Sequence, residues 1–199
     1  IDIRTEGLVT HFDVTRPDAD TITITLSMPG RHNVLNALAV VALSDHLGVC
    51  DASLIKALSE FQGVGRRFQL AGEIQKSGSR IPVIDDYGHH PKELEVTFEA
   101  LRGAYPGRRL VSVFQPHRYS RTQDLFDDFV SVLTTADELV LLPVYPAGEA
   151  PIVGAESKDL AQSIRRLGHC RPYVEGEFEQ VIARVGALVE PNDVVLIQG

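Results

Sequence analysis

Residues 81–114 have the sequence IPVIDDYGHHPKELEVTFEALRGAYPGRRLVSVF, from which the fold class can be argued. The two ends, residues 81–85 and 110–114, are rich in leucine or β-branched residues and show little alternation of polar and apolar positions. This composition is typical of strands that are buried on both faces of a parallel sheet. Residues 93–104 between them have the pattern of an amphipathic helix. The segment therefore predicts a strand, a crossover helix and a second, parallel strand.

The alternation of strands and helices continues to the end of the chain. Further strands are predicted at residues 139–144 and 194–197. Amphipathic helices are predicted at residues 122–134, 157–167 and 177–189. We therefore predict an α/β fold with a Rossmann-like, doubly wound, mostly parallel sheet over residues 65–199.

The first 64 residues have a different pattern. Stretches rich in β-formers at residues 7–14 and 21–26 predict a hairpin with its turn at residues 16–20. Two helices follow, one from His32 to Leu47, closed by Gly48, and one capped by Asp51. The glycine-rich segment 62–67 ends in two arginines and is the best candidate for a domain boundary. We predict two domains, residues 1–64 and residues 65–199.

Composition limits the classes of partner and compartment. The chain has 199 residues, with 19 Lys or Arg against 27 Asp or Glu, and the net charge of −8 argues against nucleic acid or an anionic membrane as the main partner. No apolar run approaches the roughly 18 residues that a membrane-spanning helix needs. We expect Cys50 and Cys170 to be buried thiols in a reducing cytoplasm. The chain begins without Met and ends in an apolar strand, so we expect both ends to continue in a longer protein.

Polar groups are concentrated directly after the predicted strand at residues 81–85. The sequence DDYGHHP at residues 85–91 brings carboxylates, a phenol and imidazoles to the carboxyl end of that strand, where open α/β sheets bind ligands. The N–H groups at the start of the following helix favour an anion. We interpret Asp86, Tyr87, His89 and His90 as parts of a binding site. The alternative is that His90 caps the helix and the acids are solvated.

A second polar group follows the predicted strand at residues 110–114. Arg118 and Arg121 are three positions apart and follow His117, so a helix that begins here would place both guanidinium groups on one face. Two planar guanidinium groups on one face could hold a carboxylate or a phosphate. The alternative is that both arginines pair with acidic residues of an exposed helix, namely Asp124, Asp127 and Asp128.

The remaining candidates lie nearer the N-terminus. Asn33 and Asn36 are three positions apart, and their amides can donate and accept, which suits the edge of a nucleobase; Asn33 would serve equally well as an N-cap. Arg66 and Arg67 belong either to the site or to a solvated linker. No Cys or third His follows the pair His89 and His90 at ligand spacing, so we expect no metal ligand in this chain.

Four motifs together make the whole chain resemble the Mur ligases. They are PGRHNVLNALA at residues 29–39, GVGRRF at 63–68, DDYGHHP at 85–91 and FQPHRYSRT at 114–122. The resemblance is strongest to the members that add the first amino acid, L-alanine. Neither Gly-x-Gly-x-x-Gly nor Gly-x-x-x-x-Gly-Lys-Ser/Thr occurs, so the phosphate-binding loop of such a ligase is expected upstream of residue 1.

The resemblance implies a cytoplasmic, ATP-dependent ligase of peptidoglycan synthesis. Such an enzyme joins L-alanine to the carboxylate of UDP-N-acetylmuramate through an acyl phosphate and releases ADP and phosphate. Residues 1–64 would be the end of a P-loop-type central ATP-binding domain, and residues 65–199 most of the C-terminal domain. The Mg²⁺ ligands are expected upstream, and the fragment alone is expected to be inactive.

The resemblance also implies roles for individual residues. Those expected to bind ATP are His32, Asn33, Asn36, Arg67, Asp86 and Tyr87, with the asparagines near the adenine, Arg67 near the phosphates and Asp86 on the ribose. Those expected to hold L-alanine and the muramyl end are His89, His90, His117, Arg118 and Arg121. Arg67 and His89 are the expected catalytic groups. Since these residues lie on both sides of the glycine-rich segment, closure of the C-terminal domain is expected to complete the site.

Two alternatives stay open at this point. One is a murein tripeptide recycling ligase or another amino-acid-adding Mur ligase, although the FQPHRYSRT motif argues against the recycling enzyme. The other belongs to a different class: an α/β module that binds a nucleotide or a protein partner without chemistry.

Overall fold

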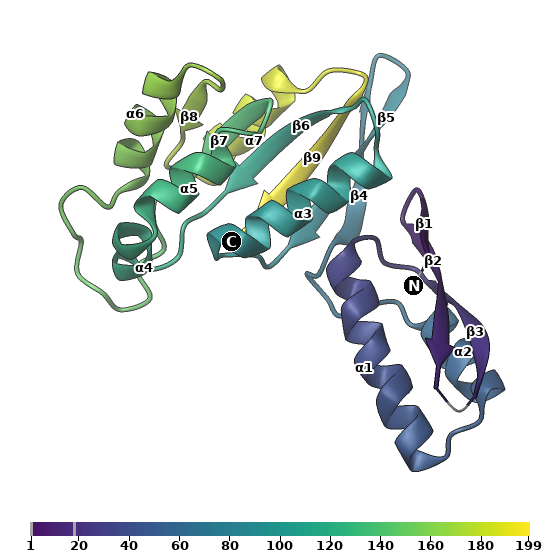
Figure 1. The fold of residues 1–199 in the computed structure, drawn as a ribbon. Helices are drawn as coiled ribbons and strands as arrows, with labels where there is room; N and C mark the ends of the chain where they lie inside the picture. Colours follow the sequence, from purple (N-terminus) through teal and green to yellow (C-terminus); the bar gives the residue numbers. More distant parts are fainter. Residues whose placement is uncertain (1, 18) are drawn as a thin grey trace. The chain divides into compact units, whose positions relative to one another are not determined.

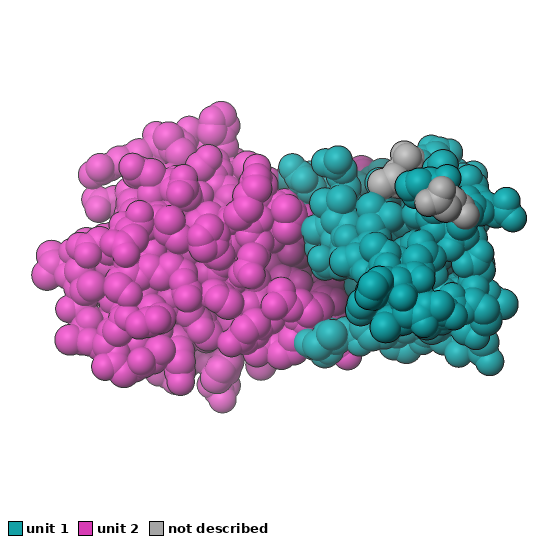
Figure 2. Space-filling view, turned by 60° about the horizontal axis from the view of Figure 1, so that its bottom comes forward, with its two compact units in different colours: residues 1–65, 99–106 teal, residues 66–98, 107–199 magenta. Residues whose placement is uncertain are grey.

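The computed structural model describes residues 2–17 and 19–199, which divide into two compact units. Unit 1 comprises the residues up to Gly65 together with Glu99–Pro106, and unit 2 comprises Arg66–Phe98 and Gly107–Gly199 (Figure 2). Each unit has its own sheet and its own hydrophobic core.

Unit 1 contains a three-stranded antiparallel sheet and two helices. The elements are β1 (Ile3–Glu6), β2 (Val9–Arg16), β3 (Ala19–Leu26), α1 (Arg31–Leu47) and α2 (Asp51–Glu60). Alternate residues of β2 and β3, among them Phe12 and Ile24, are buried and share one core with the apolar faces of both helices. The predicted hairpin strands and both predicted helices are confirmed, whereas β1 has no clear sequence pattern. Asp18 of the predicted turn lies outside the described residues.

The ends of the two helices differ in part from the prediction. Gly48 closes α1 as predicted, because its φ of 69° lets the N–H groups of residues 48 and 49 bond to carbonyl groups of the last turn. Since α1 already begins at Arg31, the alternative role of Asn33 as N-cap is wrong. The N-cap position of α2 is occupied by Cys50 and not by Asp51.

Unit 2 is built on a six-stranded sheet in the order β4-β5-β9-β6-β7-β8 (Figure 1). The strands are β4 (Gln69–Lys76), β5 (Ser79–Asp86), β6 (Arg109–Phe114), β7 (Glu138–Leu141), β8 (Pro172–Val174) and β9 (Asp193–Gln198). β4 pairs antiparallel with β5, and the other neighbouring strands are parallel. The predicted α/β fold with a mostly parallel sheet is confirmed.

Helices cover both faces of this sheet (Figure 1). They are α3 (Pro91–Ala104), α4 (Tyr119–Asp124), α5 (Phe126–Leu133), α6 (Ser157–Leu167) and α7 (Phe178–Leu188). On one face, Val181 of α7 shares a core cluster with Val111 and Val195. On the other face, the ring of Phe129 in α5 lies 5.6 Å from the ring of Phe114. Burial on both sides explains why most residues of the central strands are apolar.

Three features of unit 2 differ from the prediction. The edge strand β4 and the short β8 have no apolar run, and most residues of β4 are exposed. The helix predicted at residues 122–134 is two helices separated at Leu125, whose φ of −114° and ψ of 24° are not helical. The strand predicted at residues 139–144 ends at Leu141, and Pro143 has no N–H group with which to extend the pairing.

The two cysteines differ in exposure. Cys170 is buried as expected, but Cys50 is exposed, so the expectation was wrong for that residue. Within the described residues, no helix combines the length and the apolar character needed to cross a bilayer.

Candidate functional site

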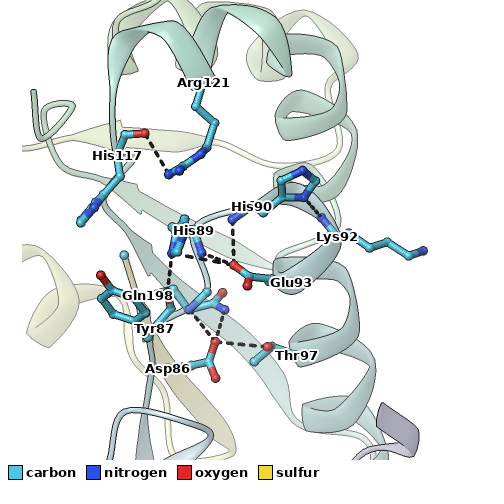
Figure 3. A network of polar contacts seen from close by, with 12 residues as sticks. Asp86, Tyr87, His89, His90, Lys92, Glu93, Thr97, His117, Arg121 and Gln198 are labelled. Atoms are coloured by element: carbon cyan, nitrogen blue, oxygen red, sulfur yellow. Dashed lines mark hydrogen bonds and ion pairs between the residues drawn. The ribbon is translucent and has the colours of Figure 1, made fainter. Parts of the chain in front are cut away.

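The carboxyl ends of three neighbouring strands meet at one edge of the unit 2 sheet. Asp86 ends β5, Gln198 ends β9 and the last residue of β6 is Phe114, and the strand register places these three residues next to one another. The loops at residues 87–90 and 115–118 both leave this edge. Unit 2 therefore brings together the two polar motifs of the sequence (Figure 3).

The carboxylate of Asp86 is buried, with 6% of the residue exposed, and is fully used within the protein. Its Oδ1 accepts hydrogen bonds from the backbone N–H of Gly88 (2.9 Å), Nε2 of Gln198 (2.9 Å) and Oγ1 of Thr97 (3.3 Å). Its Oδ2 accepts a bond from the backbone N–H of Phe68 (3.0 Å). Asp86 is therefore hydrogen-bonded to the backbone at Phe68, near the start of unit 2, and to side chains of helix α3 and strand β9 (Figure 3). The alternative of a solvated acid is wrong for this residue.

The start of α3 is capped by two side chains. Nδ1 of His90 accepts a bond from the backbone N–H of Lys92 (3.2 Å), so the capping role that we gave as the alternative for His90 is present. Oε2 of Glu93 accepts bonds from the backbone N–H groups of His89 (2.9 Å) and His90 (3.1 Å). Burial alone would raise the pKa of Glu93, but these bonds and the nearby charges of His89 and Arg67 outweigh it and lower the pKa.

Four rings form a continuous cluster above the strand ends. The ring of Tyr87 lies 5.2 Å from that of His89 at nearly a right angle, and the rings of His89 and His117 are stacked at 6.0 Å. The ring of Tyr145 lies 5.0 Å from that of His117, and the guanidinium group of Arg66 lies over Tyr87 at 5.0 Å. The cluster joins the loops after β5, β6 and β7.

The two imidazoles of this cluster have different surroundings. Nδ1 of His89 lies 3.0 Å from the carbonyl oxygen of Tyr87, which can only accept, so the neutral ring carries its proton on Nδ1 and presents Nε2 as an acceptor. Burial lowers the pKa of His117 below the ordinary value of 6.5, and the charges of His89, Arg121 and Arg66 lower it further. His117 is therefore neutral near pH 7.

The two arginines of the FQPHRYSRT motif, Arg118 and Arg121, have different surroundings. Arg118 occupies the N-cap position of α4 with a φ of 71°, and its Nε donates to Oε1 of Glu149 at 2.8 Å. Nη1 of Arg121 lies 3.4 Å from the carbonyl oxygen of His117. Arg118 thus pairs with a carboxylate from the loop after β7, and not with the acidic residues of the following helix that we named as the alternative.

The predicted site residues of unit 1 all lie on α1. Asn33 is buried, and its Nδ2 donates to the carbonyl oxygen of Pro29 at 2.8 Å. Asn36 is exposed, and His32 is partly buried at the start of the same helix. These three residues belong to unit 1, whereas the other predicted residues, from Arg67 to Arg121, belong to unit 2.

The side chains at this edge of unit 2 suit an anionic ligand. Arg66, Arg67 and Arg118 are exposed, and Arg121 is partly exposed. Their planar guanidinium groups match the oxygen atoms of a carboxylate or a phosphate. The donors present therefore fit the phosphates of a nucleotide or the carboxylate of an amino acid. Over residues 2–17 and 19–199, no three His, Cys, Asp or Glu side chains are grouped so that they could hold a metal ion.

Five residues of this site were missed by sequence reasoning, namely Glu93, Thr97, Tyr145, Glu149 and Gln198. Gln198 offers a signal that could have been used, because it is a polar residue directly after the apolar run at residues 194–197. Thr97 and Glu149 offer none, since a threonine in a helix and a glutamate in a loop are ordinary.

Comparison with known proteins relates the chain to one family. A family model described as "Mur ligase, glutamate ligase domain" matches residues 66–199. The structure of the UDP-N-acetylmuramate-alanine ligase of Thermotoga maritima is similar over 100% of this chain, with 30% sequence identity and a TM-score of 0.77. That match covers 41% of the Thermotoga chain.

Two more solved structures share the fold at lower identity. A murein peptide ligase of Psychrobacter arcticus is 23% identical over 98% of this chain and 39% of its own, with a TM-score of 0.61. The MurF ligase of Thermotoga maritima, solved in complex with ADP, is 18% identical over 100% of this chain and 42% of its own, with a TM-score of 0.64. The chain thus spans about two fifths of the length of these relatives.

Proposed function

Because this chain belongs to the Mur ligase family, we propose that it is the C-terminal portion of an ATP-dependent ligase that joins L-alanine to UDP-N-acetylmuramate. The bond formed is an amide between the amino group of L-alanine and the muramyl carboxylate, and ADP and phosphate are released. ATP, when bound, supplies the phosphoryl group that converts the carboxylate to an acyl phosphate. The reaction is assigned to the cytoplasm, where ATP and nucleotide sugars are available.

One observation carries this proposal. Three arginines and two imidazoles from the segment before β4, the loops after β5 and β6 and the start of α4 lie near the carboxyl ends of the strands, and this set suits an amino-acid carboxylate beside a phosphoryl group, namely Arg67, His89, His117, Arg118 and Arg121. L-Alanine is preferred as the amino acid because the alanine ligase of Thermotoga maritima reaches 30% identity over the whole chain. The murein peptide ligase and the MurF ligase named above are less than 25% identical and support the fold alone.

We assign the domains as the sequence predicted. Residues 1–64 would be the end of a central ATP-binding domain, and residues 65–199 would be the C-terminal domain. Asn36, which is exposed on α1, is the better candidate of the two asparagines for contact with adenine, since Asn33 is bonded to Pro29. His32 lies on the same helix and is assigned to the same end of ATP.

The remaining ATP contacts are assigned to unit 2. Tyr87 is 39% exposed and presents its ring at the strand edge, and Arg67 is assigned to the negative charge of the phosphates. The carboxylate of Asp86 already accepts four hydrogen bonds, so a ribose hydroxyl that bonds to it would have to displace one of the present donors. Mg²⁺ is proposed as the second cofactor, with its ligands outside this chain.

The amino-acid end of the reaction is assigned to the two loops after β5 and β6. Arg118 and Arg121 would bind the carboxylate of L-alanine, with His90 at the edge of the same surface. His117 is neutral near pH 7 and could take a proton from the ammonium group of the substrate, which must be lost before the amine can attack. Nε2 of His89 is a second acceptor beside it.

The test uses the full-length protein that contains this sequence. Phosphate release is measured with ATP, Mg²⁺ and UDP-N-acetylmuramate, and the amino compound is L-alanine, D-glutamate or a murein tripeptide. We expect release only with L-alanine. Release with the tripeptide or with D-glutamate would assign the chain to another member of the family, and nucleotide binding without any release would favour the non-catalytic module.

A further inference from the structure

Glu149 lies in the loop after β7 and accepts three hydrogen bonds from the FQPHRYSRT motif at residues 114–122. Its Oε1 accepts from Nε of Arg118 (2.8 Å) and from Oγ of Ser120 (2.7 Å), and its Oε2 accepts from the backbone N–H of Ser120 (2.9 Å). Hydrogen bonds to a charged carboxylate are the stronger kind. One side chain therefore fixes both the backbone and a guanidinium group of the loop that carries the two proposed substrate arginines.

This loop needs an external contact because of its own backbone. Arg118 has a φ of 71° and a ψ of 127°, a conformation that residues with a Cβ atom adopt only when neighbouring contacts hold it. Arg118 also stands at the N-cap position of α4, but its side chain has no acceptor for the first N–H groups of that helix. Glu149 supplies the acceptor that the N-cap residue lacks.

The two loops are joined through their backbones as well. The N–H of Arg118 donates to the carbonyl oxygen of Tyr145 (2.8 Å), and the N–H of Tyr145 donates to that of Pro116 (2.8 Å). His117 and Tyr145 form an isolated parallel bridge. Glu149 follows Tyr145 by a tight turn, in which its own N–H donates to the carbonyl oxygen of Pro146 (2.9 Å). The position of Glu149 is thus set by the same pair of loops that it holds.

The side chain of Glu149 stays ionised near neutral pH. The backbone bond from Ser120, followed by its hydroxyl bond and the bond from Arg118, lowers the pKa of Glu149 to about 2. The contact with Arg118 uses Nε, the nitrogen nearest the aliphatic stem. It therefore orients the guanidinium plane without using the two terminal amino groups.

From these contacts we infer that Glu149 is a positioning residue, which holds Arg118 and the start of α4 so that Arg118 and Arg121 bind the carboxylate of the amino-acid substrate. This inference rests on the proposed function. Glu149 itself touches neither substrate nor cofactor in this account, and it acts through Arg118 and Ser120.

The experiment compares two substitutions in the full-length enzyme. Glu149→Gln removes the charge, and its matched control is Glu175→Gln, because Glu175 accepts from Nε of Arg184 at the same 2.8 Å and is similarly buried. We expect Glu149→Gln to raise the KM for L-alanine by about tenfold, with the KM for ATP unchanged, because a charge-assisted contact is lost on the amino-acid side only. Glu175→Gln should change neither constant.

A double substitution separates positioning from general stability. Because Glu149 acts in part through Arg118, Glu149→Gln should raise the KM for L-alanine by a smaller factor in the Arg118→Gln enzyme than in the wild type, and the rest of its effect passes through Ser120. Effects of the two changes that multiply, or a Glu149→Gln enzyme with the wild-type KM, would overturn the inference. Ser120→Ala, which loses one donor only, is the milder variant and should raise the same KM by a smaller factor.

A spectroscopic readout keeps this test apart from that of the proposed function. In wild type, the backbone ¹H–¹⁵N resonance of Ser120 should show the downfield shift of an amide bonded to a carboxylate, and Glu149→Gln should remove it. An active enzyme without this change would overturn the role of Glu149 alone. A wild type inactive with every amino compound would overturn the proposed function and, with it, the kinetic role of Glu149.

Discussion

The carboxylate of Asp86 and the side-chain amide of Gln198 are hydrogen-bonded at 2.9 Å, although the two residues are 112 positions apart in the sequence. Asp86 ends β5 and Gln198 ends β9, so the bond fastens the last strand of the chain to the strand that precedes the proposed site. Both side chains are buried, with 6% and 2% of the residues exposed. The geometry of the loop at residues 87–90 therefore depends on the correct insertion of β9 into the centre of the sheet.

The substitution Asp86→Ala should destabilise unit 2. It would leave buried donors without an acceptor, among them the N–H groups of Phe68 and Gly88, and each such group costs about 1–3 kcal/mol. We expect a loss of at least about 3 kcal/mol in the free energy of unfolding, measured by urea denaturation. The control is Asp85→Ala, since Asp85 is partly exposed and 3.5 Å from Arg66, and should cost less than about 1 kcal/mol. Equal losses would contradict the account.

The substitution Gly88→Ala should also destabilise unit 2. A Cβ atom at Gly88 would lie 2.7 Å from both Oδ1 of Asp86 and Nε2 of Gln198, so their hydrogen bond must be distorted. We expect a cost of about 1–3 kcal/mol, as for other overpacked sites. Gly186→Ala in α7, where nothing lies within 4 Å of the added atom, should instead stabilise by about 0.5–1 kcal/mol through helix propensity. Thermal unfolding should therefore show a lower Tm than wild type for Gly88→Ala and a higher Tm for Gly186→Ala.

The pH dependence of stability should contain a contribution from His117. Its pKa is lower in the folded than in the unfolded chain, so between the two values the unfolded chain binds more protons and stability rises with pH. The contribution is fully present above pH 6.5 and is lost as the pH falls through the folded-state pKa. His117→Gln should flatten the unfolding free energy in this window. An unchanged slope would contradict the burial assigned to this ring.

The charge of Arg121 should be visible in the titration of His117. Arg121 is one of the charges that lower the pKa of His117, so Arg121→Gln should raise that pKa, followed by the imidazole ¹H–¹³C resonances in NMR. Arg166→Gln, an exposed position on α6, is the control and should leave the titration unchanged. The same titration in both variants would mean that Arg121 does not face His117.

The two cysteines should react at different rates. Cys50 is exposed, and the hydroxyl and backbone N–H of Ser53 lower its pKa, with Oγ of Ser53 3.1 Å from the sulfur. Burial raises the pKa of Cys170 to about 11. Iodoacetamide should therefore modify Cys50 at least about tenfold faster than Cys170, as measured by mass spectrometry of the native protein. Ser53→Ala should slow the reaction of Cys50, and modification of Cys170 first would contradict the structure.

The sequence predicted the regular elements well where one physical signal dominated. Residues 110–114 and 194–197 are almost entirely apolar because both faces of the sheet are covered, and this pattern identifies the strands without a structure. The edge strand β4 was not predicted, because most of its residues are exposed and give no apolar pattern, and it includes Gly72. The order of the strands could not be obtained from periodicity, since nothing in residues 193–198 indicates that β9 inserts between β5 and β6.

The candidate site could be predicted only as far as its residues are neighbours in the sequence. The DDYGHHP motif contains Asp86, Tyr87 and His89, and its place after a strand gave the edge of the sheet. Gln198, which bonds to Asp86, and Glu149, which bonds to Arg118, come from a distant strand and a distant loop, and only the tertiary fold brings them to the site. For the same reason, sequence could not show that the carboxylate of Asp86 is already used within the protein.

The central claim is that this chain belongs to an enzyme that adds L-alanine to UDP-N-acetylmuramate. The most direct measurement is mass spectrometry of the nucleotide-sugar product formed by the full-length protein with ATP, Mg²⁺ and an equimolar mixture of L-alanine and D-glutamate. We expect a product heavier by one alanine residue, with formation strongly reduced in Arg121→Gln. A product that carries glutamate, or no product from a folded wild-type protein, would contradict this claim.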